Sequence, residues 1–97
     1  MHRKIKYVLN TNKIIYTKHA LKRIYEHGIF IHKIEDTIKT GELKIESKRQ
    51  NKYRAIKRYG NYIYHVVFRV EINKMIVITC RKVRVWYAQN VVLKWKR

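Results

Sequence analysis

The chain has 97 residues, 46% of them hydrophobic, and carries 24 Lys and Arg residues against 6 acidic ones, for a formal net charge of +18. This length suits one domain, residues 1–97, and the apolar fraction excludes a disordered chain. Self-repulsion at such a charge costs stability, so the composition predicts a polyanionic partner, RNA or DNA.

The charge is unevenly distributed along the chain. Residues 1–46 hold 10 Lys and Arg and 5 acidic residues, whereas residues 47–97 hold 14 Lys and Arg and only Glu71. The second half is therefore the expected binding face. No apolar span and no cleavable leader follow Met1, so a membrane partner is not expected. Cys80 is the single cysteine, which favours the reducing cytoplasm, that of a host cell if a mobile element encodes the protein.

The first half of the chain reads as a short β-prone region followed by two helices. Residues 4–9 and 14–16 have strand composition, separated by a turn at Thr11. Thr17 is a typical N-cap for a helix over residues 18–27, and Gly28 can close that helix in the left-handed conformation. Isoleucines at helical spacing predict a second helix over residues 31–40, ended by Gly41.

The second half reads as four strands joined by tight turns. Strand composition marks residues 43–48, 53–59, 62–70 and 75–83, and short polar connectors predict antiparallel pairing of consecutive strands. The expected fold class is α+β, with two N-terminal helices packed on an antiparallel β-meander of about four strands. Residues 84–97 form a C-terminal extension for which we favour a helix.

Side chains alternate between the two faces of each strand, which predicts the core. Along residues 62–70 we expect the core face to hold Tyr62, Tyr64, Val66, Phe68 and Val70, and the other face Ile63, His65, Val67 and Arg69. Along the next strand, strict alternation places Met75, Val77, Thr79 and Arg81 on one face and Ile76, Ile78, Cys80 and Lys82 on the other.

The first helix collects cations on one arc. His19, Arg23 and His27 are spaced one turn apart and can grip one phosphate region, with Lys18 and Lys22 beside them. In this interpretation His19 is a general acid or base and Arg23 a phosphate ligand. The alternative is a solvated helix face with no chemistry.

A spaced set of residues resembles a family of small proteins with the pattern Ser-x-His-Ala-x-x-Arg, Arg-Gly-Ile, Gly-Glu and a closing Ile-Thr-Val strand. The matching residues span about 14–83 and are Thr17, His19, Ala20, Arg23, Gly28, Ile29, Gly41, Glu42 and the run 76–79 with Arg81. Thr17 replaces the serine and keeps the cap, and His27 stands where the pattern has arginine. That family is similar to RelE-like and BrnT-like toxins of the ribonuclease superfold that includes barnase and colicin nucleases.

The resemblance implies a RelE-like domain that cuts RNA without a metal or other cofactor, as an mRNA interferase does. It points to His19 and Arg23, and less firmly to Thr79 and Arg81; of these we take His19, Arg23 and Arg81 as the catalytic residues. In such chemistry the ribose 2′-OH attacks the adjacent phosphate while cations stabilise the developing charge. It also implies a small acidic antitoxin protein as a partner, because complementary charge gives fast association.

Further cations extend the expected nucleic-acid surface beyond these residues. The binding set comprises Lys18, Lys22, His27, Arg54, Lys57 and Lys82, and His65 and Tyr87 are possible partners in the site. Lysines and tyrosines on strands more often serve solvation and packing, which is the competing interpretation.

Two other functions fit the same sequence. Glu42-Leu43-Lys44 and Glu46-Ser47-Lys48 both read Glu-x-Lys, and with Asp36 upstream, Glu42 and Lys44 could build a metal-dependent nuclease site. Alternatively the protein is a non-catalytic binding module, whose strand aromatics stack bases while Lys and Arg hold phosphates. The aromatics in question are Tyr53, Tyr59, Tyr62 and Tyr64.

Overall fold

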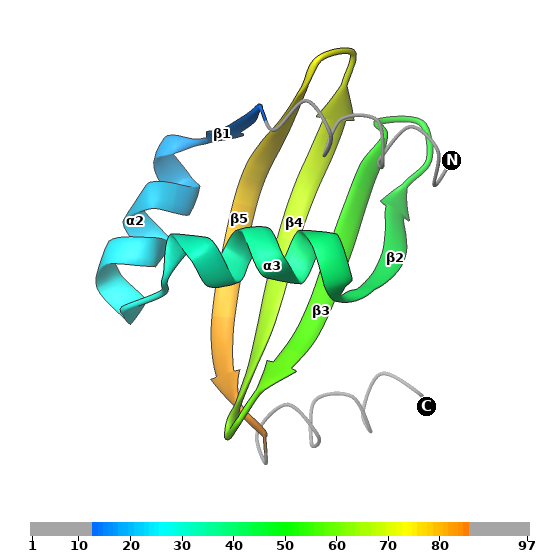
Figure 1. Ribbon diagram of the computed structural model, residues 1–97. Coiled ribbons are helices and arrows are strands. Elements are labelled where there is room, and N and C mark those ends of the chain that lie inside the picture. Colours follow the sequence, from blue (N-terminus) through cyan, green and yellow to red (C-terminus); the bar gives the residue numbers. More distant parts are fainter. Residues whose placement is uncertain (1–12, 86–97) are drawn as a thin grey trace.

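The computed structural model describes residues 13–85 as two helices on one five-stranded sheet. Figure 1 shows both helices on the same side of the sheet, with α3 crossing its strands. The expected strand over residues 4–9, the extension beyond residue 85 and Tyr87 lie outside the described residues. The elements are β1 Ile14–Tyr16, α2 Lys18–His27, α3 Ile31–Thr40, β2 Glu42–Ser47, β3 Lys52–Tyr59, β4 Tyr62–Glu71 and β5 Lys74–Arg84.

The α+β class is confirmed, and β2 to β5 form the expected antiparallel meander. The strand order is β1-β5-β4-β3-β2, so the sheet has one strand more than expected and is mixed. The added strand is β1, which pairs parallel to β5 with Ile14 opposite Met75. The sequence marked residues 14–16 as β-prone, but a three-residue run carries no information about a partner some 60 positions away.

The two ends of α2 follow the predicted capping. Thr17 Oγ1 accepts a hydrogen bond from the Ala20 amide at 3.1 Å and donates one to the Ile78 carbonyl at 2.9 Å. This one side chain therefore caps the helix and ties it to β5. Gly28 closes the helix at φ 59°, a left-handed conformation in which its amide bonds to the Ile24 carbonyl.

The other helix-ending glycine has a different reason to be glycine. Gly41 has φ −78°, so its backbone needs no left-handed freedom. A Cβ there would lie 2.5 Å from the Thr37 carbonyl oxygen and 2.7 Å from that of Ile56. Gly41 thus permits the close approach of the end of α3 to β3.

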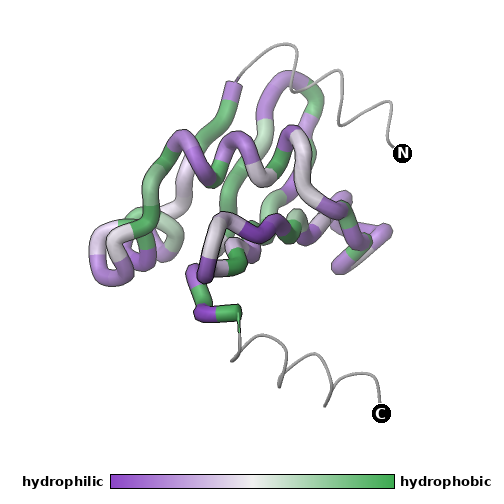
Figure 2. Tube along the Cα trace, turned by 60° about the horizontal axis from the view of Figure 1, so that its bottom comes forward, coloured by the Kyte–Doolittle hydropathy of each residue, from purple (hydrophilic) through white to green (hydrophobic). Residues whose placement is uncertain are grey.

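The core lies between the helices and the sheet. Tyr64, Val66, Phe68 and Val70 of β4 are buried there, as the alternation predicted, and Tyr62 packs against them. Ala20, Ile34 and Ile38 cover them from the helices. Figure 2 shows hydrophobic and hydrophilic positions alternating along the tube, the pattern that lets a sheet bury one face.

A polar network fixes α3 across β3. Lys57 Nζ donates to Asp36 Oδ2 at 2.7 Å and to Thr40 Oγ1 at 2.6 Å, and the Tyr59 hydroxyl donates to the same Asp36 oxygen at 2.6 Å. These hydrogen bonds lower the pKa of Asp36, the one from Lys57 most. Burial, and then the bond to Asp36, raise the pKa of Tyr59 to about 12.

A bulge in β5 changes the alternation predicted for this strand. Val67 is opposite Thr79 whereas Phe68 is opposite Val77, so Ile78 is an extra residue without a partner on β4. One inserted residue turns every later side chain to the other face. Met75 and Val77 are buried on the face that packs against the helices. The expectation that Thr79 and Arg81 share that face is wrong, because Cys80 takes the buried position beyond the bulge.

Candidate nucleic-acid interface

One face of the sheet is not covered by a helix among residues 13–85, and Figure 1 shows both helices on the opposite side. We call it the open face. The strand register assigns to it the residues that alternate with the buried ones, among them Lys44 on β2, Arg54 on β3, His65 on β4 and Arg81 on β5. All four neighbouring strands thus contribute a cation or an imidazole to one surface.

These four residues form a contiguous group, the open-face cluster. Lys44 is directly opposite Arg54, and His65 is directly opposite Arg81. The two pairs are joined diagonally, because Arg54 Nη1 lies 3.3 Å from His65 Nδ1. Arg81 reaches this cluster only because of the bulge in β5, which turns its side chain away from the helices.

Glu46 orients the Arg54 guanidinium. Its Oε1 accepts from Arg54 Nε at 2.7 Å and lies 2.6 Å from Nη2. Charge-assisted pairing of this kind fixes the planar guanidinium in one orientation. The remaining Nη1 points to His65, so one arginine links a carboxylate and an imidazole.

His65 is held neutral in this environment. Burial, and then the positive charges of Arg54, Arg81 and Lys44, lower its pKa from 6.5 to about 4. A guanidinium has no acceptor atom, so His65 Nδ1 must accept from Arg54 and the ring hydrogen sits on Nε2. The cluster therefore presents N–H donors and positive charge, the arrangement that binds a phosphate oxygen.

The cations of the open-face cluster lie beside partly buried apolar side chains. Val67, which lies beside Arg54 and Thr79 on the open face, is only 5% exposed. Ile56 and Ile63 on the same face are half-buried. Charges set against an apolar surface are screened less by water than charges at the ends of free side chains.

The cations predicted on α2 lie elsewhere. Lys18, His19, Lys22 and His27 are exposed on the helix surface. Arg23 is half-buried near Cys80, and its charge opposes the burial that raises the pKa of that thiol to about 11. Its Nε is buried and has no hydrogen-bond partner among residues 13–85.

The structure therefore does not assemble the three residues expected to be catalytic. Within the described part of the chain, no hydrogen bond or ion pair joins His19 or Arg23 to Arg81. Arg81 instead has His65 as its cross-strand neighbour.

Two members of the expected binding set lie on the helix side of the sheet. Lys57 is engaged by Asp36 and Thr40 in the α3 network. Lys82 Nζ lies 4.7 Å from the centre of the Tyr62 ring and 3.4 Å from the Gly28 carbonyl oxygen. Of the expected set, Arg54 alone belongs to the open-face cluster.

The residues of the metal-dependent alternative are not brought together. Asp36 faces β3 from the helix side, where Lys57 and Tyr59 occupy one of its oxygens. Glu42 is on the open face, 3.9 Å from Lys44, because its neighbour Leu43 packs on the core. In residues 13–85 no three His, Cys, Asp or Glu side chains gather as a metal site would require.

The aromatic platform of the binding-module alternative is not exposed on the open face either. Tyr53 and Tyr64 are each 2% exposed, and Tyr59 and Tyr62 pack against the core. Across residues 13–85, neither helix has the length and apolar composition needed to cross a bilayer.

Sequence reasoning missed two members of this site. Glu46 and Lys44 were assigned to the metal-dependent motif, whereas in the structure Glu46 holds Arg54 and Lys44 stands opposite it. The signal was present as charged residues alternating along residues 42–46 and 52–58. Reading it required the register between those two strands.

A family model described as a domain of unknown function, DUF4258, matches residues 16–80. The match spans both helices, all of β2 to β4 and most of β5; it includes Lys44, Arg54 and His65 of the open-face cluster and ends one residue before Arg81. No curated protein and no solved structure matches the chain.

Proposed function

The chain belongs to the DUF4258 family, and we propose that it binds nucleic acid on the open face of its sheet and cleaves RNA there without a metal ion. The observation that carries the proposal is the packing of His65 among Arg54, Arg81 and Lys44. Among residues 13–85, Glu46 pairs with Arg54 and Glu42 lies 3.9 Å from Lys44, so two acidic side chains face three cations. A phosphate is the ligand that would offset the remaining charge.

Binding draws on the whole chain as well as on the cluster. A protein with net charge +18 releases counterions from a polyanion as it binds, which favours association and makes it depend on salt. The cluster supplies the local contact, since Arg54 and Arg81 can each donate two hydrogen bonds to phosphate oxygens. The exposed cations of α2 would extend the electrostatic field beyond the cluster.

Metal-independent cleavage needs a base, an acid and positive charge at the phosphate. We assign the base to Glu46, whose carboxylate can take the proton from the ribose 2′-OH as that oxygen attacks phosphorus. Arg54 and Arg81 neutralise the charge that develops on the phosphate oxygens. The bond from phosphorus to the 5′-oxygen then breaks, leaving a 2′,3′-cyclic phosphate.

His65 supplies the proton that the departing 5′-oxygen needs. In the free protein its pKa of about 4 keeps it neutral. A bound phosphate offsets the charges of Arg54 and Arg81, which raises the pKa of the imidazole toward its ordinary value and lets it hold a proton. Binding of the substrate phosphate thus raises the pKa of His65 and allows this residue to act as the acid.

The test is an RNA and a DNA cleavage assay in EDTA. We expect RNA cutting by the wild type and loss of cutting in Arg81→Ala and His65→Gln. Lys39→Ala removes an exposed cation from α3 and serves as the matched control. His19→Ala and Arg23→Ala test the helix cations in parallel, and loss of activity in these two alone would move the site to α2.

Two other results would overturn the catalytic part. Cutting that requires Mg²⁺ would select the metal-dependent class, and salt-sensitive binding without cutting would select the binding module. Absence of binding at low salt would overturn the whole proposal. We place the activity in the cytoplasm, where the buried thiol of Cys80 stays reduced, with an acidic antitoxin protein as the partner that would neutralise the open face.

A further inference from the structure

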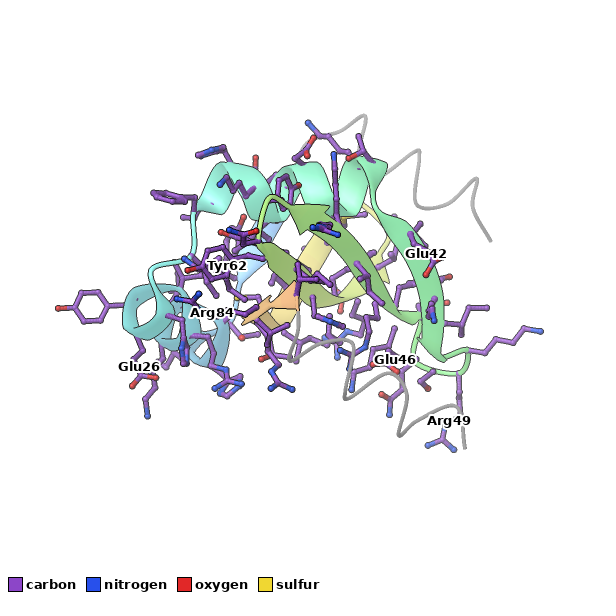
Figure 3. All side chains as sticks on the ribbon, turned by 90° about the horizontal axis from the view of Figure 1, so that it is seen from below. Glu26, Glu42, Glu46, Arg49, Tyr62 and Arg84 are labelled. Carbon is purple, nitrogen blue, oxygen red and sulfur yellow. The ribbon has the colours of Figure 1, made fainter. Side chains whose placement is uncertain are left out.

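The open face continues beyond the open-face cluster toward the turn that joins β3 to β4. Ile63 is the residue of β4 on this face next to His65, and the register places Arg58 of β3 on one side of Ile63 and Val83 of β5 on the other. These three residues form a row about 7 Å along the strands from the row of His65. Figure 3 views the molecule from below, where the β3–β4 turn lies in Figure 1, and shows Glu46 on the side of the strands away from α3.

Most of this end of the open face is apolar. Ile63 and Val83 are half-buried, and so is Ile56, which lies directly opposite His65 and diagonally next to Ile63. We call Ile56, Ile63 and Val83 the apolar shelf. No helix among residues 13–85 covers it, because both helices lie on the other side of the sheet. A flat ring that lies on this shelf would remove apolar surface from water.

Arg58 borders the apolar shelf with two donor groups. Its side chain is exposed, and its Nε donates to the Gly60 carbonyl at 2.8 Å. Gly60 has φ 59° and belongs to the tight turn between β3 and β4, so this bond holds the planar guanidinium against a fixed part of the backbone. Among residues 13–85, neither terminal nitrogen of Arg58 has a hydrogen-bond or ion-pair partner. An apolar floor with a few oriented polar groups at its border is the usual composition of a ligand site.

We propose that the apolar shelf and Arg58 bind a guanine base of the RNA whose phosphate the open-face cluster holds, an inference that rests on the proposed function. Guanine presents two neighbouring acceptors, O6 and N7, and an arginine can donate to both at once. An arginine has no acceptor atom, so the amino groups of adenine and cytosine would find no partner on Arg58. Uracil offers a single acceptor on the corresponding edge. Guanine is therefore the base that uses both terminal nitrogens.

The short step from the open-face cluster to the apolar shelf suits neighbouring parts of one RNA strand. Arg81 and Val83 are two residues apart on β5, so a phosphate at one and a base at the other would be separated by about 7 Å. In an RNA duplex this edge of guanine lies in a deep, narrow groove that side chains cannot read, whereas an unpaired base exposes it. The site would therefore select a guanine in a single-stranded segment, next to the phosphate that is cut.

Equilibrium binding to 2′-O-methylated uridine octamers tests the proposal without cleavage, because the methyl group blocks the oxygen that would attack phosphorus. One octamer carries a central guanine, a second carries adenine in its place, and a third carries 7-deazaguanine, which lacks the N7 acceptor. We expect the wild type to bind the guanine octamer about tenfold more tightly than either of the others. Arg58→Gln should bind the guanine octamer no more tightly than the other two, because the paired donors are gone.

Matched controls separate base recognition from charge. Arg49→Gln removes the same charge from an exposed position in the turn after β2, and should keep the preference for guanine. Ile63→Thr removes apolar surface from the shelf and should weaken the guanine and adenine octamers alike, by about threefold.

Equal affinity of the wild type for the guanine and adenine octamers overturns the proposal, and so does a guanine preference that survives in Arg58→Gln. In both cases the octamers are bound, so the nucleic-acid binding of the proposed function stands. Absence of binding to every octamer at low salt is a different result, which overturns the proposed function and this inference with it.

Discussion

The titration of His65 gives the most direct check of the open-face cluster. Its pKa of about 4 results from burial first and from Arg54, Arg81 and Lys44 next. Arg81→Gln removes the exposed cation that stands directly opposite His65 on β5 and leaves the Arg54 contact in place. We expect the pKa of His65 to rise in this variant.

The size of the rise follows from Coulomb's law. Two charges about 6 Å apart, at an effective dielectric constant of about 50 for a partly exposed pair, interact by about 1 kcal/mol. That energy corresponds to a pKa rise of about 0.8. Because burial is the larger cause, the imidazole of the Arg81→Gln variant should still titrate below 6.

Stability has to change with pH in the matching direction. The pKa of His65 is lower in the folded protein than in the unfolded chain, so the unfolded chain binds the proton first as pH falls through 6.5. The folded state loses stability from there down to about pH 4, by roughly 2 kcal/mol once the partial exposure of the ring is discounted. Arg81→Gln should narrow the pH range over which the folded state loses stability, and His65→Gln should remove this loss.

Proton NMR of the imidazole C–H signals measures the pKa, with His65→Gln to assign the resonance among the five histidines. Urea unfolding at pH 7.0, 5.5 and 4.5 measures the stability change. A second titration with inorganic phosphate should move the pKa upward in the wild type and less in Arg81→Gln. A His65 pKa near 6.5 in the wild type would show that the cluster is not packed as described.

Other expected outcomes concern the elements that hold the site in place. Gly41→Ala should cost about 1–3 kcal/mol in urea unfolding, because the added Cβ meets two backbone oxygens, whereas Gly28→Asn, in an open left-handed position, should cost less. Thr17→Ala should cost about 1–2 kcal/mol, since it removes the cap of α2 and the bond to β5. Asp36→Asn should reduce the loss of stability below pH 3.8. The pKa of this carboxyl is lower in the folded protein than in the unfolded chain, so its contribution to stability disappears as the pH falls through that range. Equal pH profiles for wild type and variant would refute the α3 network.

Local signals were sufficient for most of the fold. Thr17 and Gly28 correctly predicted the two ends of α2, because capping and left-handed closure depend on only a few neighbouring residues. The turn at Gly60 and the alternation along β4 placed the hairpin and its buried face for the same reason. The parallel pairing of β1 with β5 was out of reach, because it depends on where α2 and α3 lead the chain between them.

The candidate site was less accessible to prediction because it depends on register. Arg81 was singled out on a resemblance, but strict alternation assigned it to the wrong face of β5. Arg54 was recognised as a cation, and nothing local to it indicates that His65 and Glu46 are its contacts. A sequence pattern can indicate which residues belong to a site. Which of them contact one another depends on how the strands pair, and the sequence alone does not give that register.

The bulge at Ile78 decides which cations can act together. Without the extra residue, the alternation along β5 would turn Arg81 toward the helices, near α2. Lys82 would then lie on the open face, beside the neighbours of His65. With it, Lys82 turns to Tyr62 and Gly28, and Arg81 joins His65. The Ile78 carbonyl is also the acceptor that Thr17 uses to tie α2 to the sheet. One irregular residue, Ile78, therefore connects the cap of α2 to the side chains of the open face. This connection is a physical reason why Thr17 and the strand over residues 76–81 occur together in the sequence pattern described above.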